Sequence, residues 1–207
     1  MELKLDYTEK RILTGVIFSI ALIMANIITI KVIDLQLFDL RIHTGLIIYP
    51  IVHIISSIMA DVYSKKDAQR NIIFGLGSYI LFLIMIILVV FLPSPAIGNV
   101  DITGAFNTMP RPLLAASVAF ILGNFITVAM TLHVKRRYIK SKSILKNIVA
   151  IDVGLIVDTI IFILIAYIGV LLPDRILSIV IVNSVFYIIW TAILTPVIGW
   201  FKKWIKS

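Results

Sequence analysis

The sequence predicts an all-α membrane protein, a bundle of six transmembrane helices with both termini in the cytoplasm. Of its 207 residues, 60% are hydrophobic and 14% are charged, and the mean hydropathy is +1.08. Soluble domains use apolar residues for about half of their length, and one of this size could not bury so much apolar surface. Six apolar stretches approach or exceed the about 20 residues that a helix needs to cross a bilayer core.

The six stretches follow one another without a Pro-, Gly- or Ser-rich linker, so residues 1–207 are expected to form a single membrane domain. The second stretch is the most polar, because it contains two histidines and two serines. Pro50 and Pro196 are expected inside the second and sixth helices, since membrane helices tolerate proline better than soluble ones do. In chain order the predicted spans are 12–30, 43–60, 72–92, 113–134, 148–172 and 176–200.

The basic residues orient these spans. Fifteen of the 19 lysines and arginines lie in the two tails, in the loop after the second stretch and in the loop after the fourth. The other four are Lys31, Arg41, Arg111 and Arg175. The positive-inside rule places the richer side in the cytoplasm. The net charge of +8 is thereby explained by topology in a cell-membrane lipid bilayer, and no nucleic acid partner is expected.

A short internal similarity suggests a repeat of three plus three helices. Residues 24–30 read Met-Ala-Asn-Ile-Ile-Thr-Ile, and residues 122–128 read Leu-Gly-Asn-Phe-Ile-Thr-Val, at an offset of 98 residues. The first helix runs outward and the fourth inward, so the repeat would be inverted. Inverted repeats in transporters enclose the substrate site between them. Chance similarity between apolar segments is the alternative.

Asp158 lies near the middle of the fifth predicted span. A charged side chain there costs about 2.5–3.5 kcal/mol on the insertion scale, so it must face protein or water. We expect it to bind a solute or a proton, and the alternative is a hydrogen bond that only holds helices together. Phe162 lies one turn further along the same face and would provide an aromatic wall.

The second predicted span carries polar side chains at steps of four, which places them on one broad helical face. They are Tyr49, His53, Ser57 and Asp61. His53, near the midplane, is expected to contact the solute or to relay a proton. Asp61, near the cytoplasmic edge, is expected either to meet the solute or to pair with Lys65 or Arg70.

Asn26 in the first span and Asn124 in the fourth are further candidates for solute binding, and hydrogen bonding between helices is their alternative role. The sixth span adds Asn183, Tyr187, Thr191 and Thr195 at steps of four, and hydrogen bonding between helices is the favoured role of the two threonines. Polar side chains from five of the six spans are typical of a path or pocket for a polar solute.

Enzyme chemistry is not predicted. The chain has no cysteine, no His-Glu-x-x-His motif, no phosphate-binding glycine loop and no Gly-x-Ser-x-Gly. Neither a cofactor nor a metal site is expected. Acid–base catalysis by a buried pair of His53 and Asp158 is a minor alternative.

Several ordered blocks resemble one known family. They are Ala25-Asn26 with Lys31; Tyr49-Pro50 followed by Asp61-Val62-Tyr63; Phe106-Asn-Thr-Met-Pro-Arg111; and Asp158-Thr-Ile-Ile-Phe162 followed by Ala166-Tyr167-Ile-Gly169. Taken together and in this order, they are similar to the VUT family of queuosine-precursor transporters. The resemblance spans nearly the whole chain. Departures include Ser57 where the family has Asp and Asp61 where it has Glu.

The resemblance implies uptake of a 7-deazaguanine such as 7-cyano-7-deazaguanine. Asp158 would accept the two adjacent N–H donors of the guanine-like edge, and Asn26 and Asn124 would bind its acceptors. Tyr49, Phe162 or Trp190 would stack on the ring, as aromatic side chains do with bases. His53 would bind the solute or carry a proton.

Two other functions remain open from the sequence. One is the substrate-binding subunit of an energy-coupling-factor vitamin importer, since Ala21-x-x-x-Ala25 resembles its partner-docking motif. The other is a non-transporting interaction subunit of a membrane complex. The source of energy and the oligomeric state, a homo-oligomer included, are also left open.

Overall fold

The computed structural model describes residues 5–29, 32–35, 40–90, 92, 110–137 and 145–206. Lys31 and most of the block 106–111 lie outside them. Six segments of the described residues are helices long and apolar enough to cross a membrane, which confirms the predicted fold class. They are α1 (Tyr7–Ile28), η1 with α2 (Thr44–Ile47 and Tyr49–Val62), α3 (Lys65–Val90), α5 (Pro110–Arg137), α6 (Leu145–Tyr167) and α7 (Pro173–Ile193).

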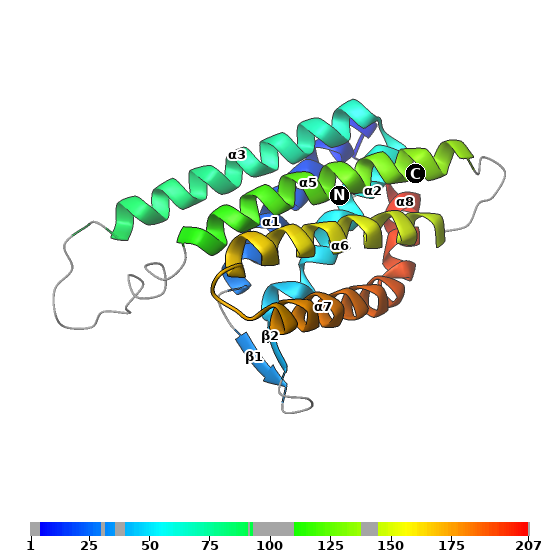
Figure 1. The fold of residues 1–207 in the computed structure, drawn as a ribbon. Helices are drawn as coiled ribbons and strands as arrows, with labels where there is room; N and C mark the ends of the chain where they lie inside the picture. The colour runs from blue at the N-terminus through cyan, green and yellow to red at the C-terminus, as the bar shows by residue number, and fades with distance from the viewer. Residues whose placement is uncertain are drawn as a thin grey trace.

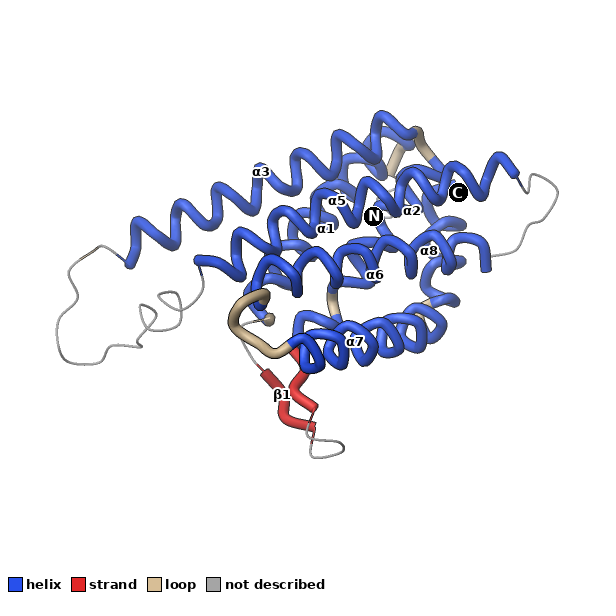
Figure 2. Tube along the Cα trace, in the orientation of Figure 1, coloured by secondary structure: helices blue, strands red, loops and turns tan. Residues whose placement is uncertain are grey.

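The spanning helices run in alternating directions and form one bundle (Figure 1). A small antiparallel hairpin of β1 (Val32–Leu35) and β2 (Leu40–His43) projects from the end at which α1 finishes (Figure 2). At the opposite end, α8 (Thr195–Lys206) lies across the bundle, and Lys10 Nζ of α1 sits 5.7 Å from the centre of the Trp204 ring. The start of α1 and the last helix therefore share one end, which the positive-inside rule assigns to the cytoplasm.

Both prolines expected inside helices lie at helix starts instead. Pro50 occupies the first turn of α2, and Pro196 is the second residue of α8. Proline lacks the N–H that a helix interior needs, but the first turn has no use for it. The predicted second span therefore begins as strand and 3-10 turn, with its α-helix starting at Tyr49. The predicted sixth span ends at Ile193, seven residues before the expected Trp200.

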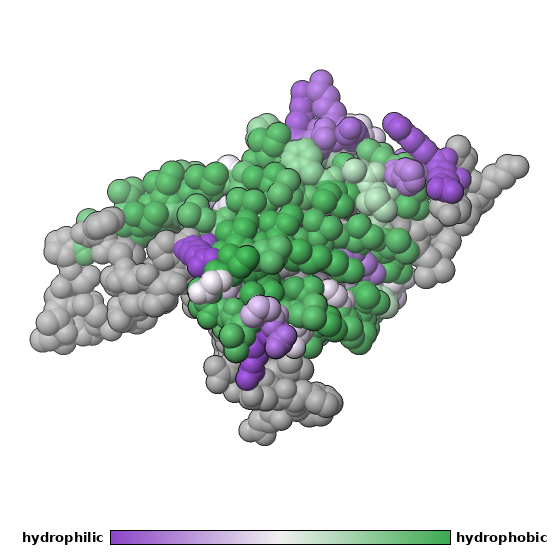
Figure 3. Space-filling model, viewed as in Figure 1, coloured by the Kyte–Doolittle hydropathy of each residue, from purple (hydrophilic) through white to green (hydrophobic). Residues whose placement is uncertain are grey.

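The outer faces of the bundle are apolar. Figure 3 shows a nearly continuous hydrophobic surface over the spanning helices, with hydrophilic residues gathered towards their ends. Large side chains such as Phe74 of α3 and Ile189 of α7 are 69% and 56% exposed. In water such a surface would aggregate, whereas lipid tails match it. The chain is therefore a multi-pass membrane protein.

Helices α5 and α6 lie side by side and approach closely at two glycines. A Cβ on Gly154 would overlap Thr127 Oγ1 and come within 2.9 Å of the Gly123 carbonyl oxygen. A Cβ on Gly123 would come within 2.6 Å of the Asp158 Cβ. Small residues allow membrane helices to pack backbone to backbone, and here they bring Asp158 against α5.

A matching contact joins α1 to η1. A Cβ on Gly45 would overlap Thr29 Oγ1 and lie 2.9 Å from the Ala25 carbonyl oxygen, just as Gly154 faces Thr127 and Gly123. Thr29 and Thr127 correspond in the two similar sequence segments. This local equivalence is what an inverted three-plus-three repeat would produce, and the repeat itself stays a prediction.

We expect Gly154→Ala to destabilise the protein, because the new methyl group would meet Thr127 and the α5 backbone. Gly77→Ala is the matched control, since a Cβ there meets nothing within 4 Å and alanine favours a helix over glycine. Thermal unfolding in detergent should show a lower melting temperature for Gly154→Ala and an equal or higher one for Gly77→Ala. Equal melting temperatures for the two variants would contradict the close α5–α6 contact.

Candidate functional site

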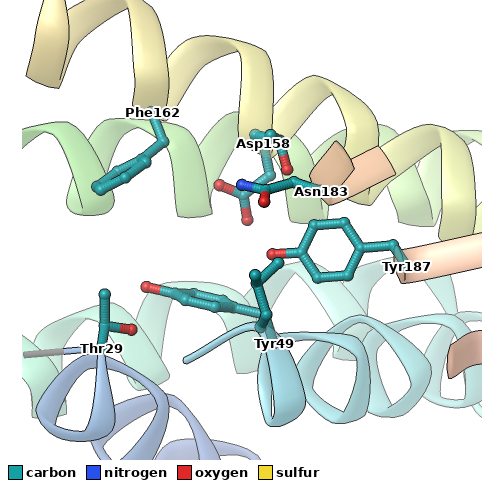
Figure 4. A pocket seen from close by; sticks show the side chains of 8 residues that line it. Thr29, Tyr49, Asp158, Phe162, Asn183 and Tyr187 are labelled. Carbon is teal, nitrogen blue, oxygen red and sulfur yellow. The ribbon is translucent and has the colours of Figure 1, made fainter. Parts of the chain in front are cut away.

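A pocket lies among α2, α6, α7 and the end of α1, with its long side chains shown in Figure 4. Its open space is about 420 Å³, the open side included, and is narrow between the side chains. Polar groups and aromatic rings alternate around it. The lining residues are Thr29, Leu46, Tyr49, Asp158, Thr159, Phe162, Asn183 and Tyr187.

Three of the predicted site residues meet in this pocket: Tyr49, Asp158 and Phe162. Asp158 is only 7% exposed, and it lies beside Asn183 on one wall (Figure 4). The Tyr187 hydroxyl points toward this pair, and the Tyr49 ring lies across the pocket from it. The pocket thus offers one carboxylate, one amide and two phenol groups between aromatic rings.

His53 lies directly behind Asp158 and is fully buried, without lining the pocket. Its Nε2 is 3.1 Å from Asp158 Oδ2, and its Nδ1 is 2.8 Å from Thr127 Oγ1. Thr127 has a single proton, which it donates to the Gly123 carbonyl oxygen at 3.1 Å, so Oγ1 accepts from Nδ1–H. The contact between Nε2 and Oδ2 then holds one further proton, which either the imidazole or the carboxyl can carry.

Neither of the two predicted asparagines lines the pocket. Asn26 Oδ1 accepts from the Tyr49 hydroxyl at 3.1 Å, which fixes the position of that ring. Asn124 Oδ1 accepts from Ser56 Oγ at 2.7 Å, and its Nδ2 lies 3.5 Å from His53 Nε2. Their position makes them supports for Tyr49 and His53 in this structure.

Asp61 lies at the other end of α2, away from the pocket. It contacts Lys202 Nζ of α8 at 2.6 Å and Lys135 Nζ of α5 at 3.3 Å. The predicted pairing with Lys65 or Arg70 is therefore wrong, because lysines of α5 and α8 occupy both carboxylate oxygens of Asp61. One carboxylate instead joins α2, α5 and α8 at the end of the bundle.

Between the pocket and Asp61, the polar face of α2 is hydrogen-bonded to α5 and α6. Ser57 Oγ accepts from Thr131 Oγ1 at 3.0 Å and from Asn147 Nδ2 at 3.3 Å. We call Tyr49, His53, Ser57 and Asp61 the α2 stripe. The stripe forms a column of polar contacts from the pocket to the end where α8 lies.

The sequence reasoning missed part of the pocket. Thr159 and Leu46 were not singled out, and Asn183 and Tyr187 were noted as polar residues of the sixth span but not named as site residues. Their spacing of four on α7 was the pattern that could have placed them beside Asp158. Trp190 was expected to stack on a solute, but it does not line the pocket and its Nε1 donates to the Ile47 carbonyl oxygen at 3.0 Å.

Comparison with known proteins gives one match. A family model described as "Putative vitamin uptake transporter" matches residues 43–201, which run from the end of β2 into α8. The match includes α2, α6 and α7 and so contains most of the pocket. No curated protein and no solved structure matches the chain.

We expect Asp61→Asn to loosen α8, because Lys202 and Lys135 would lose their shared negative charge. A partly exposed ion pair contributes about 1 kcal/mol at most, so trypsin should cut at Lys202 and Lys203 up to roughly fivefold faster. Asp174→Asn, at the exposed start of α7, should leave the cleavage rate unchanged. An unchanged rate in Asp61→Asn would show that the ion pairs do not hold α8.

Proposed function

Because the chain belongs to the vitamin uptake transporter family, we propose that this membrane transporter takes up a planar, guanine-like solute. The proposed solute is a 7-deazaguanine such as 7-cyano-7-deazaguanine, bound in the pocket among α2, α6 and α7. The observation that carries the proposal is a nearly buried carboxylate, Asp158, facing a pocket with aromatic walls.

The donor and acceptor groups suit such a ring. A guanine-like edge presents N1–H and an amino group side by side, and a carboxylate accepts both, with charge-assisted hydrogen bonds. The Asn183 amide and the Tyr187 hydroxyl, which line the same pocket, can bind the acceptors of the ring. Tyr49 and Phe162 offer ring faces for stacking, which contributes about 1–3 kcal/mol per base.

The proton that His53 shares with Asp158 allows this carboxyl group to be either ionised or protonated. With the shared proton on His53, Asp158 is an anion held by Nε2–H at 3.1 Å and ready to accept the solute's two donors. With the proton on Asp158, the acid presents a donor and binds the solute less well. Solute binding in this proposal therefore favours the imidazolium form of the pair.

The family's description as vitamin uptake transporters favours a second candidate, a vitamin. A heteroaromatic vitamin would use the same rings and the same carboxylate. Co-purification distinguishes the importer-subunit form of this candidate, since that form requires ATPase subunits and a transporter acting alone does not.

We expect 7-cyano-7-deazaguanine to raise the melting temperature of the detergent-purified protein, because a ligand of the folded state stabilises it by mass action. Asp158→Asn should remove this shift, since the amide offers one acceptor where the carboxylate offers two. Asp174→Asn should keep it. His53→Gln should reduce it, because glutamine cannot carry the proton that His53 shares with Asp158.

Three outcomes would contradict the proposal. A rise in melting temperature with a vitamin, and none with deazaguanines, would favour the second candidate. A shift that survives both Asp158→Asn and His53→Gln would place the binding site elsewhere. The absence of a shift with any deazaguanine, together with unchanged uptake by cells expressing the protein, would exclude the proposed solute.

A further inference from the structure

A second hollow lies between α1 and α3, on the lipid-facing side of the bundle and apart from the pocket. Its open space is about 1200 Å³, the open side included. Apolar side chains that are largely exposed form its walls, among them Val16 and Ile20 of α1 and Phe74 of α3. In a bilayer, lipid or protein must fill such a groove. We call it the α1–α3 groove.

The end of the groove nearest the start of α1 is charged. Arg11 Nη1 lies 3.3 Å from Asp67 Oδ1, and Asp67 Oδ2 accepts from Ser64 Oγ at 2.6 Å. Arg70 also lines the groove, is exposed, and has no ion-pair partner among the described residues. Two guanidinium groups against one carboxylate leave this end with a charge of about +1, which matches one phosphodiester.

Asn71 gives evidence for a bound molecule that does not depend on the charged residues. It is 8% exposed and lines the groove, and its Nδ2 has no hydrogen-bond partner among the described residues. Its Oδ1 packs toward Gly15, where a Cβ would come within 2.8 Å. An unsatisfied buried amide costs about 1–3 kcal/mol. An acceptor oxygen from a bound molecule would remove that cost.

The groove has the length of one lipid leaflet. Arg11 and Ile23 mark its extent along α1, and the twelve residue steps from one to the other rise about 18 Å at 1.5 Å each. One half of a bilayer's hydrocarbon core is about 15 Å thick. The charged end lies at the side that the positive-inside rule assigns to the cytoplasm, where anionic lipids are enriched.

We propose that the α1–α3 groove binds one anionic phospholipid of the cytoplasmic leaflet. Arg11 and Arg70 hold its phosphate, and Asn71 Nδ2 donates to an ester carbonyl oxygen. An acyl chain lies along Val16, Ile20 and Phe74. The proposal is independent of the solute that the pocket binds.

Native mass spectrometry of the detergent-purified protein with added phosphatidylglycerol or phosphatidylcholine tests this site. We expect one phosphatidylglycerol bound preferentially per chain, and roughly tenfold weaker binding in Arg70→Gln, the scale of one lost charged hydrogen bond. The double variant Lys65→Gln/Lys66→Gln is the control. These lysines are exposed at the same end but do not line the groove.

The Asn71→Leu variant distinguishes a loss of lipid binding from a loss of fold stability. Leucine removes the unsatisfied amide at similar volume, so the lipid-free melting temperature should be equal or higher, while the stabilisation by phosphatidylglycerol should shrink. Equal binding of the two lipids, or an equal loss in the Lys65/Lys66 control, would overturn the proposal. A dimer that Arg70→Gln disrupts, with no lipid bound, would show that a second copy occupies the groove.

Discussion

The structure depends on satisfying the α2 stripe inside a membrane. Polar side chains at bilayer depth must find partners within the protein, because lipid offers none. Each member of the stripe is bonded to one or two neighbouring helices: Tyr49 to α1, His53 to α5 and α6, Ser57 to α5 and α6, and Asp61 to α5 and α8. Helix α2 is thereby placed at the centre, and the other helices are arranged around it.

The glycine contacts between α5 and α6 make the buried acid possible. Asp158 reaches His53 because α6 presses against α5 at Gly123 and Gly154, where any side chain would collide. The same approach brings Thr127 to His53 Nδ1, which fixes one imidazole proton on that nitrogen. Helix packing, proton position and the charge that faces the pocket are thus consequences of one close crossing.

The sequence predicts what depends on local pattern. Hydropathy locates the six spans, and steps of four locate the buried face of α2 with Tyr49 and His53. Contacts between distant residues are not encoded in such patterns, so the Asp61 partners, 74 and 141 residues away, were predicted wrongly. The prolines were misplaced because hydropathy cannot distinguish one long helix from a 3-10 turn or a break followed by a second helix.

The energies along the α2 stripe bear on how a solute could pass. The Asp61 ion pairs are partly exposed, with 23% of that side chain accessible, and pairs of this kind contribute about 1 kcal/mol or less. Separating His53 from Asp158 would leave a fully buried ring without its carboxyl partner, and an unsatisfied buried polar group costs about 1–3 kcal/mol, or more when charged. Under the proposed function, the end of the bundle at α8 is therefore the cheaper place to open, while the His53–Asp158 pair stays intact and holds the pocket.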